Sequence, residues 1–306
     1  MIWLLPLALA IAAPFVVEAL RPAMTDAVRA DRKGSFARLS RGVTRYRWYG
    51  RGGGPVAVMV HGLTTPSFVW HALATDLAEA GYRVLTYDLY GRGLSDRPPG
   101  RQDRAFFLGQ FEELLENQGL KSPVLLVGYS MGGAIATTYA AAHPERVRQL
   151  VLLAPAGTGL QLGRIARMMR DVPVLGDWLM LTLYGRGHRR AIARERAAFP
   201  KAAPVHDRQE DELRWRGFLP AVLSSLRGML SEDLSADHAA VRAAGLPVLA
   251  IWGEDDAVIP IWHMGRLAQW NRTARHEAIP GAGHGLPYTH PGRVAAEIRS
   301  FLDEAR

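Results

Sequence analysis

The run GYSMG at residues 128–132 places a serine between two glycines at the end of an apolar stretch. The residues before it, PVLLVG, indicate a buried strand, and those after it, MGGAIATTYAAAH, indicate a helix. A G-x-S-x-G sequence between a strand and a helix is typical of a nucleophile elbow, a strained turn that projects the serine hydroxyl. Gly128 and Gly132 leave room for the bend, and the helix N-terminus favours developing negative charge. We therefore predict that Ser130 is a nucleophile.

A serine is a poor nucleophile unless a base removes its proton and a third group orients that base. In strand–helix architectures with this elbow, the chain order is serine, then acid, then histidine. His284 follows the last predicted strand in AGHGLPYTHP, and an imidazole is suited to proton transfer near neutral pH. Asp255 and Asp256 follow the preceding strand in WGEDDAVIP. The pattern predicts a Ser130–His284–carboxylate triad and leaves both aspartates open.

Acyl transfer also needs hydrogen-bond donors for the oxyanion. The residue after the nucleophile supplies one backbone N–H, which here is that of Met131. The second comes from the loop after an earlier strand, and VMVHGLTTP has a glycine there that lets the backbone approach the substrate. We predict that the Leu63 N–H is this second donor.

The elements that must position these residues alternate along the chain from about residue 45 onward. Strands that are continuous apolar runs, separated by amphipathic helices, favour an α/β fold with a mostly parallel sheet covered by helices on both faces. Such a sheet carries its chemistry in the loops at the carboxyl ends of its strands. We expect strands at 46–49 (an edge strand), 56–60, 82–88, 123–128, 147–157, 247–253 and 274–281, and helices at 67–81, 104–119, 131–143 and 293–305.

The alternation stops between residues 158 and 244, where the pattern is helical and rich in Arg, Leu and Met. We predict a helical cap there, inserted into an α/β core formed by 45–157 and 245–306. Its large apolar side chains could form an acyl pocket, with Met168, Trp178 and Trp215 as the main substrate-binding candidates and Met169, Leu179 and Phe218 beside them.

The first twenty residues are almost wholly apolar, with Glu18 as the only charge. That length is about what a membrane-spanning helix needs. We predict that residues 1–22 form a hydrophobic segment that serves as a transmembrane anchor, followed by a basic linker at 23–44. Basic residues next to a membrane-spanning helix usually remain on the cytoplasmic side of the membrane. The basic linker therefore predicts a cytoplasmic catalytic domain. A cleaved signal peptide with a secreted or periplasmic domain, and an apolar arm packed on the domain, are the alternatives.

Composition limits the other function classes. The chain has 306 residues, a formal net charge of +8 and no cysteine, so disulfides, thiolate metal sites and a cysteine nucleophile are excluded. The basic charge is not gathered in a nucleic-acid-binding module, so we expect no nucleic-acid partner. The glycine-containing run DLYGRGLSD has neither dinucleotide-binding nor Walker spacing, and no histidine or carboxylate cluster has metal-ligand spacing. We expect no cofactor and no metal.

Five motifs in this order, HGLTTPSFVW, DLYGRGLSD, GYSMGG, WGEDDAVIP and GAGHGLPYTHP, resemble the α/β-hydrolase superfamily over roughly residues 45–306. The resemblance implies that Asp256 is the acid, because it stands three residues after the glycine of WG, and it implies Leu63 as the oxyanion donor after HG. It is nearest to serine carboxylesterases and monoacylglycerol-lipase-like enzymes with helical caps. Ser130 differs from the aspartate nucleophile of dehalogenases and epoxide hydrolases of this fold.

The predicted function is hydrolysis of a hydrophobic or lipid-like carboxylic ester through an acyl-enzyme. A C–C bond hydrolase, an enol-lactonase or a cofactor-free perhydrolase could use the same triad. The C–C bond hydrolases often carry asparagine before the serine, whereas Tyr129 stands there in this chain. A ligand-binding protein without catalysis is the alternative from another class. The sequence gives no prediction of the oligomeric state.

Overall fold

A twisted sheet forms the centre of the molecule in the computed structural model, which describes residues 4–304 and their side chains from residue 8 onward. In these residues the sheet has eight strands in the order β1-β2-β4-β3-β5-β6-β7-β8. The β1–β2 and β2–β4 pairs are antiparallel and the other pairs are parallel. The strands are β1 (Ser35–Leu39), β2 (Gly42–Tyr49), β3 (Val56–Val60), β4 (Arg83–Tyr87), β5 (Val124–Tyr129), β6 (Val147–Leu153), β7 (Val248–Gly253) and β8 (Arg275–Ile279).

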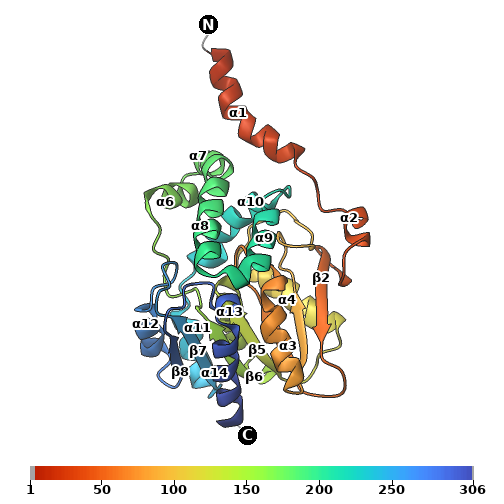
Figure 1. The fold of residues 1–306 in the computed structure, drawn as a ribbon, viewed down its shortest axis with the longest axis vertical. Helices are drawn as coiled ribbons and strands as arrows, with labels where there is room; N and C mark the ends of the chain where they lie inside the picture. Colours follow the sequence, from red (N-terminus) through yellow and green to blue (C-terminus); the bar gives the residue numbers. More distant parts are fainter. Residues whose placement is uncertain (1–3, 305–306) are drawn as a thin grey trace.

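Helices connect most of the strands and cover the sheet on both faces (Figure 1). In the described residues the α-helices are α1 (Leu4–Leu20), α2 (Asp26–Ala30), α3 (His71–Glu79), α4 (Arg104–Asn117), α5 (Met131–Ala142), α6 (Arg164–Asp171), α7 (Leu175–Leu179), α8 (Gly185–Ala198), α9 (Ala203–Glu212), α10 (Phe218–Arg227), α11 (Ser235–Ala243), α12 (His263–Trp270), α13 (Leu286–Thr289) and α14 (Pro291–Glu304). Shorter helical segments are η1 (Ser67–Trp70), η2 (Pro144–Arg146), the π-helical η3 (Met180–Tyr184), η4 (Pro200–Ala202) and η5 (Met229–Ser231). This architecture confirms the predicted fold class.

Alternating side chains of the strands enter two apolar cores, one on each face of the sheet. In β3, Val58 and Val60 join the core that includes α4 and α5, whereas Ala57 and Met59 join the core that includes α3 and α14. Since successive residues of a strand point to opposite faces, a strand buried on both faces must be apolar throughout. The unbroken run VAVMV therefore follows from its central position in the sheet.

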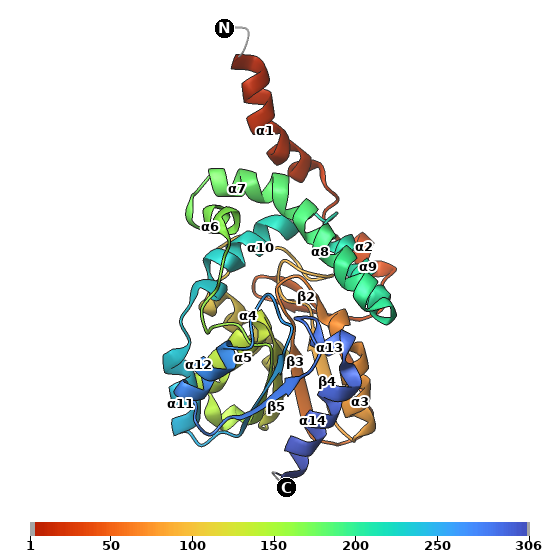
Figure 2. The ribbon, with the colours of Figure 1, turned by 60° about the vertical axis from the view of Figure 1, so that its left-hand side comes forward.

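Helices α6 to α10 lie between β6 and β7 and gather at one end of the sheet (Figure 2). We call α6 to α10, with η3 and η4, the insertion. Helix α11 lies in the same stretch of sequence but packs against α5 and α12, so it covers the sheet instead. The carboxyl ends of β3, β5, β7 and β8 meet the insertion at this end, where parallel sheets place their functional loops.

The predicted membrane anchor is wrong. Helix α1 has 17 residues, which gives a length of roughly 25 Å against the ~30 Å thickness of a bilayer's hydrocarbon core. No helix within residues 4–304 is long and apolar enough to cross a membrane. The predictions of a membrane partner and of a membrane-anchored location depended on this helix and are wrong for the same reason. Residues 1–3 of the predicted segment lie outside the described part.

The C-terminal end of α1 instead bonds to the insertion. The Gly217 N–H donates to Glu18 Oε1 at 2.6 Å, and the Arg216 side chain donates to the Ala19 carbonyl at 3.2 Å. Burial raises the pKa of Glu18, which also pairs with Arg21. Farther toward its N-terminus, α1 also contacts the insertion, because the Ala10 carbonyl accepts the Trp178 side chain of α7. Leu9, Ile11 and Val17 remain exposed, and the N-terminal part of α1 projects from the body of the molecule (Figures 1 and 2).

The first strands also differ from the prediction. The run 46–49 belongs to β2, which pairs with a neighbour on each side, and the edge strand is β1. Strand β1 and helix α2 lie inside the predicted linker 23–44. Because only Ala37 of the five β1 residues is buried, the strand lacks the apolar run that marks the central strands.

Candidate active site

Ser130 lies at the junction of β5 and α5 with φ 53° and ψ −118°. A positive φ is strained for a residue with a side chain, so the surrounding backbone must hold it. A Cβ on Gly128 would lie 2.4 Å from the Gly132 carbonyl oxygen, and a Cβ on Gly132 would lie 2.0 Å from that of Val60. The two glycines thus permit the close backbone contacts that form the elbow. The Ser130 side chain lines a cavity between the sheet and the insertion.

The structure brings His284 and Asp256 to Ser130 from two other loops. The His284 Nε2 lies 3.0 Å from Ser130 Oγ, and its Nδ1 lies 2.8 Å from Asp256 Oδ2. Asp256 is buried, and its Oδ1 accepts the N–H groups of Val258 and Ile259 at 2.7 and 2.8 Å. These bonds fix the carboxylate so that it can hold the imidazole with Nε2 toward the serine.

The neighbouring Asp255 has an exposed side chain, and no hydrogen bond or ion pair joins it to His284 among the described residues. The geometry therefore separates the two aspartates that the residue pattern left open. Asp256 is the one that meets the imidazole, in agreement with the implication of the family resemblance.

The backbone N–H groups of the two predicted oxyanion donors make no other hydrogen bonds among the described residues. Neither the Leu63 N–H nor the Met131 N–H donates to any acceptor within residues 4–304. The Leu63 loop lies against the elbow, because a Cβ on Gly62 would stand 3.3 Å from Ser130 Cβ. Free N–H groups beside a serine hydroxyl are what a tetrahedral oxyanion requires.

Two buried side chains hold this loop in place. The His61 Nδ1–H donates to the Gly62 carbonyl at 2.7 Å, while its Nε2 accepts the Leu89 N–H at 2.8 Å. Burial lowers the pKa of His61 to about 4, so the ring stays neutral and can keep both roles. Arg92 is fully buried and donates from Nε to the Leu63 carbonyl at 3.1 Å.

Comparison with known proteins decides the family. A family model described as "Alpha/beta hydrolase family" matches residues 57–297. The chain belongs to the alpha/beta hydrolase family. Ser130, His284 and both oxyanion candidates of this hydrolase lie within the matched residues.

Relatives of this hydrolase have several activities. The 2-hydroxymuconate semialdehyde hydrolase of Pseudomonas putida is 28% identical over 234 residues, covering 73% of this chain and 78% of that protein. An esterase from Thermogutta terrifontis superposes with a TM-score of 0.74 at 22% identity, covering 90% of this chain and 99% of the esterase. An enol-lactonase from Burkholderia xenovorans also gives 0.74, at 21% identity, covering 88% and 100%. The structural likenesses show the fold, and the chain is a hydrolase by family.

The cavity of this hydrolase at Ser130 has a volume of about 450 Å³. Its lining comes from the insertion and from the loops after β3, β5, β6, β7 and β8. The apolar part includes Leu160, Leu162, Ile192, Leu226, Leu230, Val258 and Ile259, and the polar part includes Thr65, His188, Glu195, Gln209 and Tyr288.

The three predicted substrate-binding residues lie outside this cavity. Trp178 donates from Nε1 to the Ala10 carbonyl of α1, Met168 is exposed, and Trp215 is buried beside Arg214. The helical spacing of Met and Trp marks an apolar face but does not tell which neighbour that face meets. The lining residues Glu195, Gln209 and Tyr288 were missed because isolated polar residues on helices give no signal of their own.

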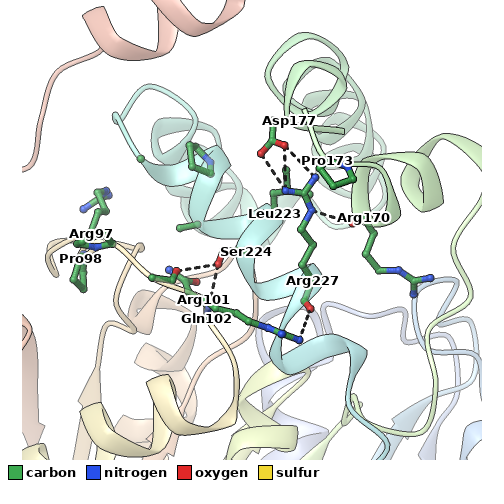
Figure 3. A pocket seen from close by; sticks show the side chains of 15 residues that line it. Arg97, Pro98, Arg101, Gln102, Arg170, Pro173, Asp177, Leu223, Ser224 and Arg227 are labelled. Carbon is green, nitrogen blue, oxygen red and sulfur yellow. Dashed lines mark hydrogen bonds and ion pairs between the residues drawn. The ribbon is translucent and has the colours of Figure 1, made fainter. Parts of the chain in front are cut away.

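A larger cavity of about 730 Å³ lies between α10, the start of the insertion and the loop before α4 (Figure 3). Four arginines line it, but their guanidinium groups already have partners. Arg227 pairs with Asp177 at 3.1 Å and donates to the Met169 carbonyl at 2.9 Å, and Arg170 pairs with Asp171. None of Ser130, Asp256 and His284 lines it. Within residues 4–304 no group of three or more His, Asp or Glu side chains is arranged to hold a metal ion.

Proposed function

We propose that this hydrolase cleaves carboxylic esters that carry a hydrophobic acyl group, with Ser130 as the nucleophile, His284 as the base and Asp256 as the group that orients His284. The observation that carries the proposal is the 3.0 Å contact between Ser130 Oγ and His284 Nε2, next to the two free N–H groups. Each oxyanion donor contributes about 3 kcal/mol to lowering the barrier in enzymes of this kind.

The reaction proceeds in two stages. Ser130 Oγ attacks the ester carbonyl carbon and its proton moves to His284 Nε2, while the oxyanion accepts hydrogen bonds from Leu63 and Met131. The bond to the alcohol oxygen then breaks, and the alcohol leaves with the proton from His284. A water molecule attacks the acyl-enzyme, gives its proton to His284, and releases the carboxylic acid as the proton returns to Ser130.

The lining of the cavity supports a substrate without a negative charge. Its apolar residues are suited to an acyl chain. No lysine or arginine of the described residues lines the cavity, whereas Glu195 and Asp255 do. An anionic substrate would meet carboxylates there and would pay for desolvation without a cationic partner. Neutral esters, or esters with a positive charge, fit this lining better.

A C–C bond hydrolase is the second candidate, because the relative from Pseudomonas putida is named a 2-hydroxymuconate semialdehyde hydrolase, which is an enzyme of that class. The muconate in that name denotes a carboxylate-bearing compound, which the acidic lining of this cavity disfavours. The two candidates share the triad and differ in substrate.

The test combines labelling with a substrate panel. A fluorophosphonate probe should modify the wild-type protein and Ser224→Ala, whose serine lies at the larger cavity, but not Ser130→Ala. The wild type should hydrolyse p-nitrophenyl esters of rising chain length faster than it cleaves a vinylogous 1,5-diketone. Failure to label between pH 6 and 9 would remove the nucleophile from the account. Diketone cleavage without ester turnover would favour the second candidate.

A further inference from the structure

The cavity at Ser130 contains two hydrogen-bond acceptors that the triad does not use. Glu195 on α8 and Gln209 on α9 both line it, together with Ser130 and His284. Both side chains belong to the insertion, while the triad comes from loops at the sheet. In each of these two side chains, one oxygen atom accepts no hydrogen bond from the described residues.

Glu195 lies beside the residue that follows His284. Its Oε1 is 2.3 Å from the position that a Cβ on Gly285 would take, so the carboxylate fills the space this glycine leaves. Its Oε2 accepts the Tyr288 hydroxyl at 2.8 Å and bonds to His206 Nε2 at 3.0 Å. Oε1 accepts no hydrogen bond from the described residues, and the side chain is 25% exposed. The carboxylate is therefore held by one oxygen and offers the other.

Gln209 presents the second acceptor. Its side chain is 4% exposed, and its Nε2 donates to Thr65 Oγ1 at 3.0 Å. Its Oε1 is buried without a hydrogen-bond partner among the described residues. Leaving a buried amide oxygen unpaired costs free energy, so a donor from a bound molecule would recover that loss.

Near the N-terminal end of α8, the cavity lining consists of apolar side chains together with His188, which stacks on Tyr184. Tyr184 directly precedes α8 and packs on the apolar core that includes Leu226 and Leu230, and all three line the cavity. Tyr184 and Glu195 are separated by roughly 16 Å along the helix axis. An elongated substrate could thus place an apolar chain at one end and a donor group at the other.

We propose that Glu195 and Gln209 form a subsite for a hydrogen-bond-donating group, a hydroxyl or an ammonium, on the alcohol part of the ester. This subsite rests on the proposed ester hydrolysis. A carboxylate accepts from both kinds of donor and repels anions, and no lysine or arginine of the described lining competes for it. The substrate class is then an ester of a hydrophobic acid with a hydroxylated or amino alcohol.

The first experiment compares octanoate esters that differ only in the donor. The pairs are 2-hydroxyethyl against propyl, and protonated 2-(dimethylamino)ethyl against 3-methylbutyl. In the wild type, kcat/KM should favour the donor-bearing member of at least one pair by roughly tenfold, which corresponds to one charge-assisted hydrogen bond. Glu195→Ala should bring both ratios close to one. Glu195→Gln should abolish the ammonium preference and keep part of a hydroxyl preference.

Ratios within each variant remove any general effect of the substitution on folding. Glu210→Gln is the matched control, since this glutamate pairs with Arg196 and does not line the cavity. Its ratios should equal those of the wild type. Wild-type ratios near one in both pairs, or ratios that Glu195→Ala leaves unchanged, would overturn the subsite while ester hydrolysis stands.

The second experiment does not depend on turnover. Calorimetry on Ser130→Ala, alone and combined with Glu195→Ala, measures binding of 2-(octyloxy)ethanol and of its methyl ether. The alcohol should bind roughly tenfold more tightly than the methyl ether, and only when Glu195 is present. That result without turnover of any ester would sink the proposed function and leave the subsite standing. Absent binding of the alcohol, or equal binding of both compounds, would overturn the subsite.

Discussion

At the scale of single residues, the neighbouring Asp255 and Asp256 differ in their burial and in the groups that their carboxylates bind. Asp256 is buried and accepts two backbone N–H groups, with its remaining oxygen on His284, whereas Asp255 is exposed. Only a fixed carboxylate can select the imidazole tautomer that accepts the serine proton. The proposed mechanism therefore depends on one of the two aspartates.

Asp256→Asn should lower kcat for a p-nitrophenyl ester by roughly 10⁴-fold, because an amide stabilises the wrong tautomer of His284. Asp255→Asn should lower it by less than tenfold. Steady-state kinetics of the two variants, with circular dichroism to check folding, measure the difference. Equal losses in both variants would argue against the assigned role of Asp256.

At the scale of elements, one arginine joins the oxyanion loop to the insertion. Arg92 donates to the Leu63 carbonyl, to the Tyr90 carbonyl at 2.9 Å and to Ser225 Oγ on α10 at 2.7 Å. Burial lowers the pKa of Arg92 to about 9, so the guanidinium keeps its charge at neutral pH. Its several donors let a single side chain hold three segments that are distant in sequence.

Arg92→Lys should lower kcat by roughly tenfold to a hundredfold with a smaller change in KM, since a lysine cannot reproduce the planar set of bonds that positions Leu63. Arg101→Lys, in an exposed arginine of the larger cavity, is the matched control and should retain wild-type kinetics. A fall in thermal stability without a fall in kcat would show that Arg92 supports folding alone.

The elements that could be predicted from sequence are those whose environment dictates their composition. The central strands β3, β5 and β7 are buried on both faces, so an apolar run marks each of them. The elbow could be predicted because its strain and its close contacts require glycine at two fixed positions. Strand β1 was missed because only one of its five residues is buried. The anchor was overpredicted because apolar composition does not give the length of the helix that forms, and α1 has 17 residues.

The residues of the proposed triad could be predicted from the order of the motifs, whereas the residues that line the cavity could not. Tyr288 and Glu195 meet through a bond between residues 93 positions apart, one on α13 and one on the insertion. Such a contact depends on how helices dock, and short-range pattern carries no information about docking. Trp178 shows the same limit, because its partner is α1 and not the substrate cavity.

At the scale of the whole molecule, Glu212 links the insertion to the loop that follows β4. It ends α9 and accepts the Gly93 N–H at 2.9 Å, and Arg97 lies 3.9 Å away. Burial is the main cause that raises the pKa of Glu212 to about 7, against the lowering effect of Arg97. A carboxyl with a raised pKa in the folded state binds its proton more tightly when folded. Its stabilising contribution is present below pH 4.5 and is lost as the pH rises through 7.

In the wild type, titration of Glu212 should lower the free energy of unfolding by about 2 kcal/mol between pH 5 and pH 8. Glu212→Gln should lack this decrease, so its free energy of unfolding should depend less on pH. Urea unfolding at the two pH values measures this. Glu210→Gln serves as the control, since Glu210 is partly exposed and paired with Arg196. Parallel pH profiles of the wild type and Glu212→Gln would contradict the assigned burial effect.

The central claim is that Ser130, His284 and the N–H groups of Leu63 and Met131 act on one carbonyl. The most direct test is a crystal structure of the wild-type protein after reaction with an alkyl fluorophosphonate. The account predicts phosphorus bonded to Ser130 Oγ, with the phosphoryl oxygen roughly 2.7–3.1 Å from the N atoms of both Leu63 and Met131. An adduct on another residue, or a phosphoryl oxygen directed away from both nitrogens, would contradict it.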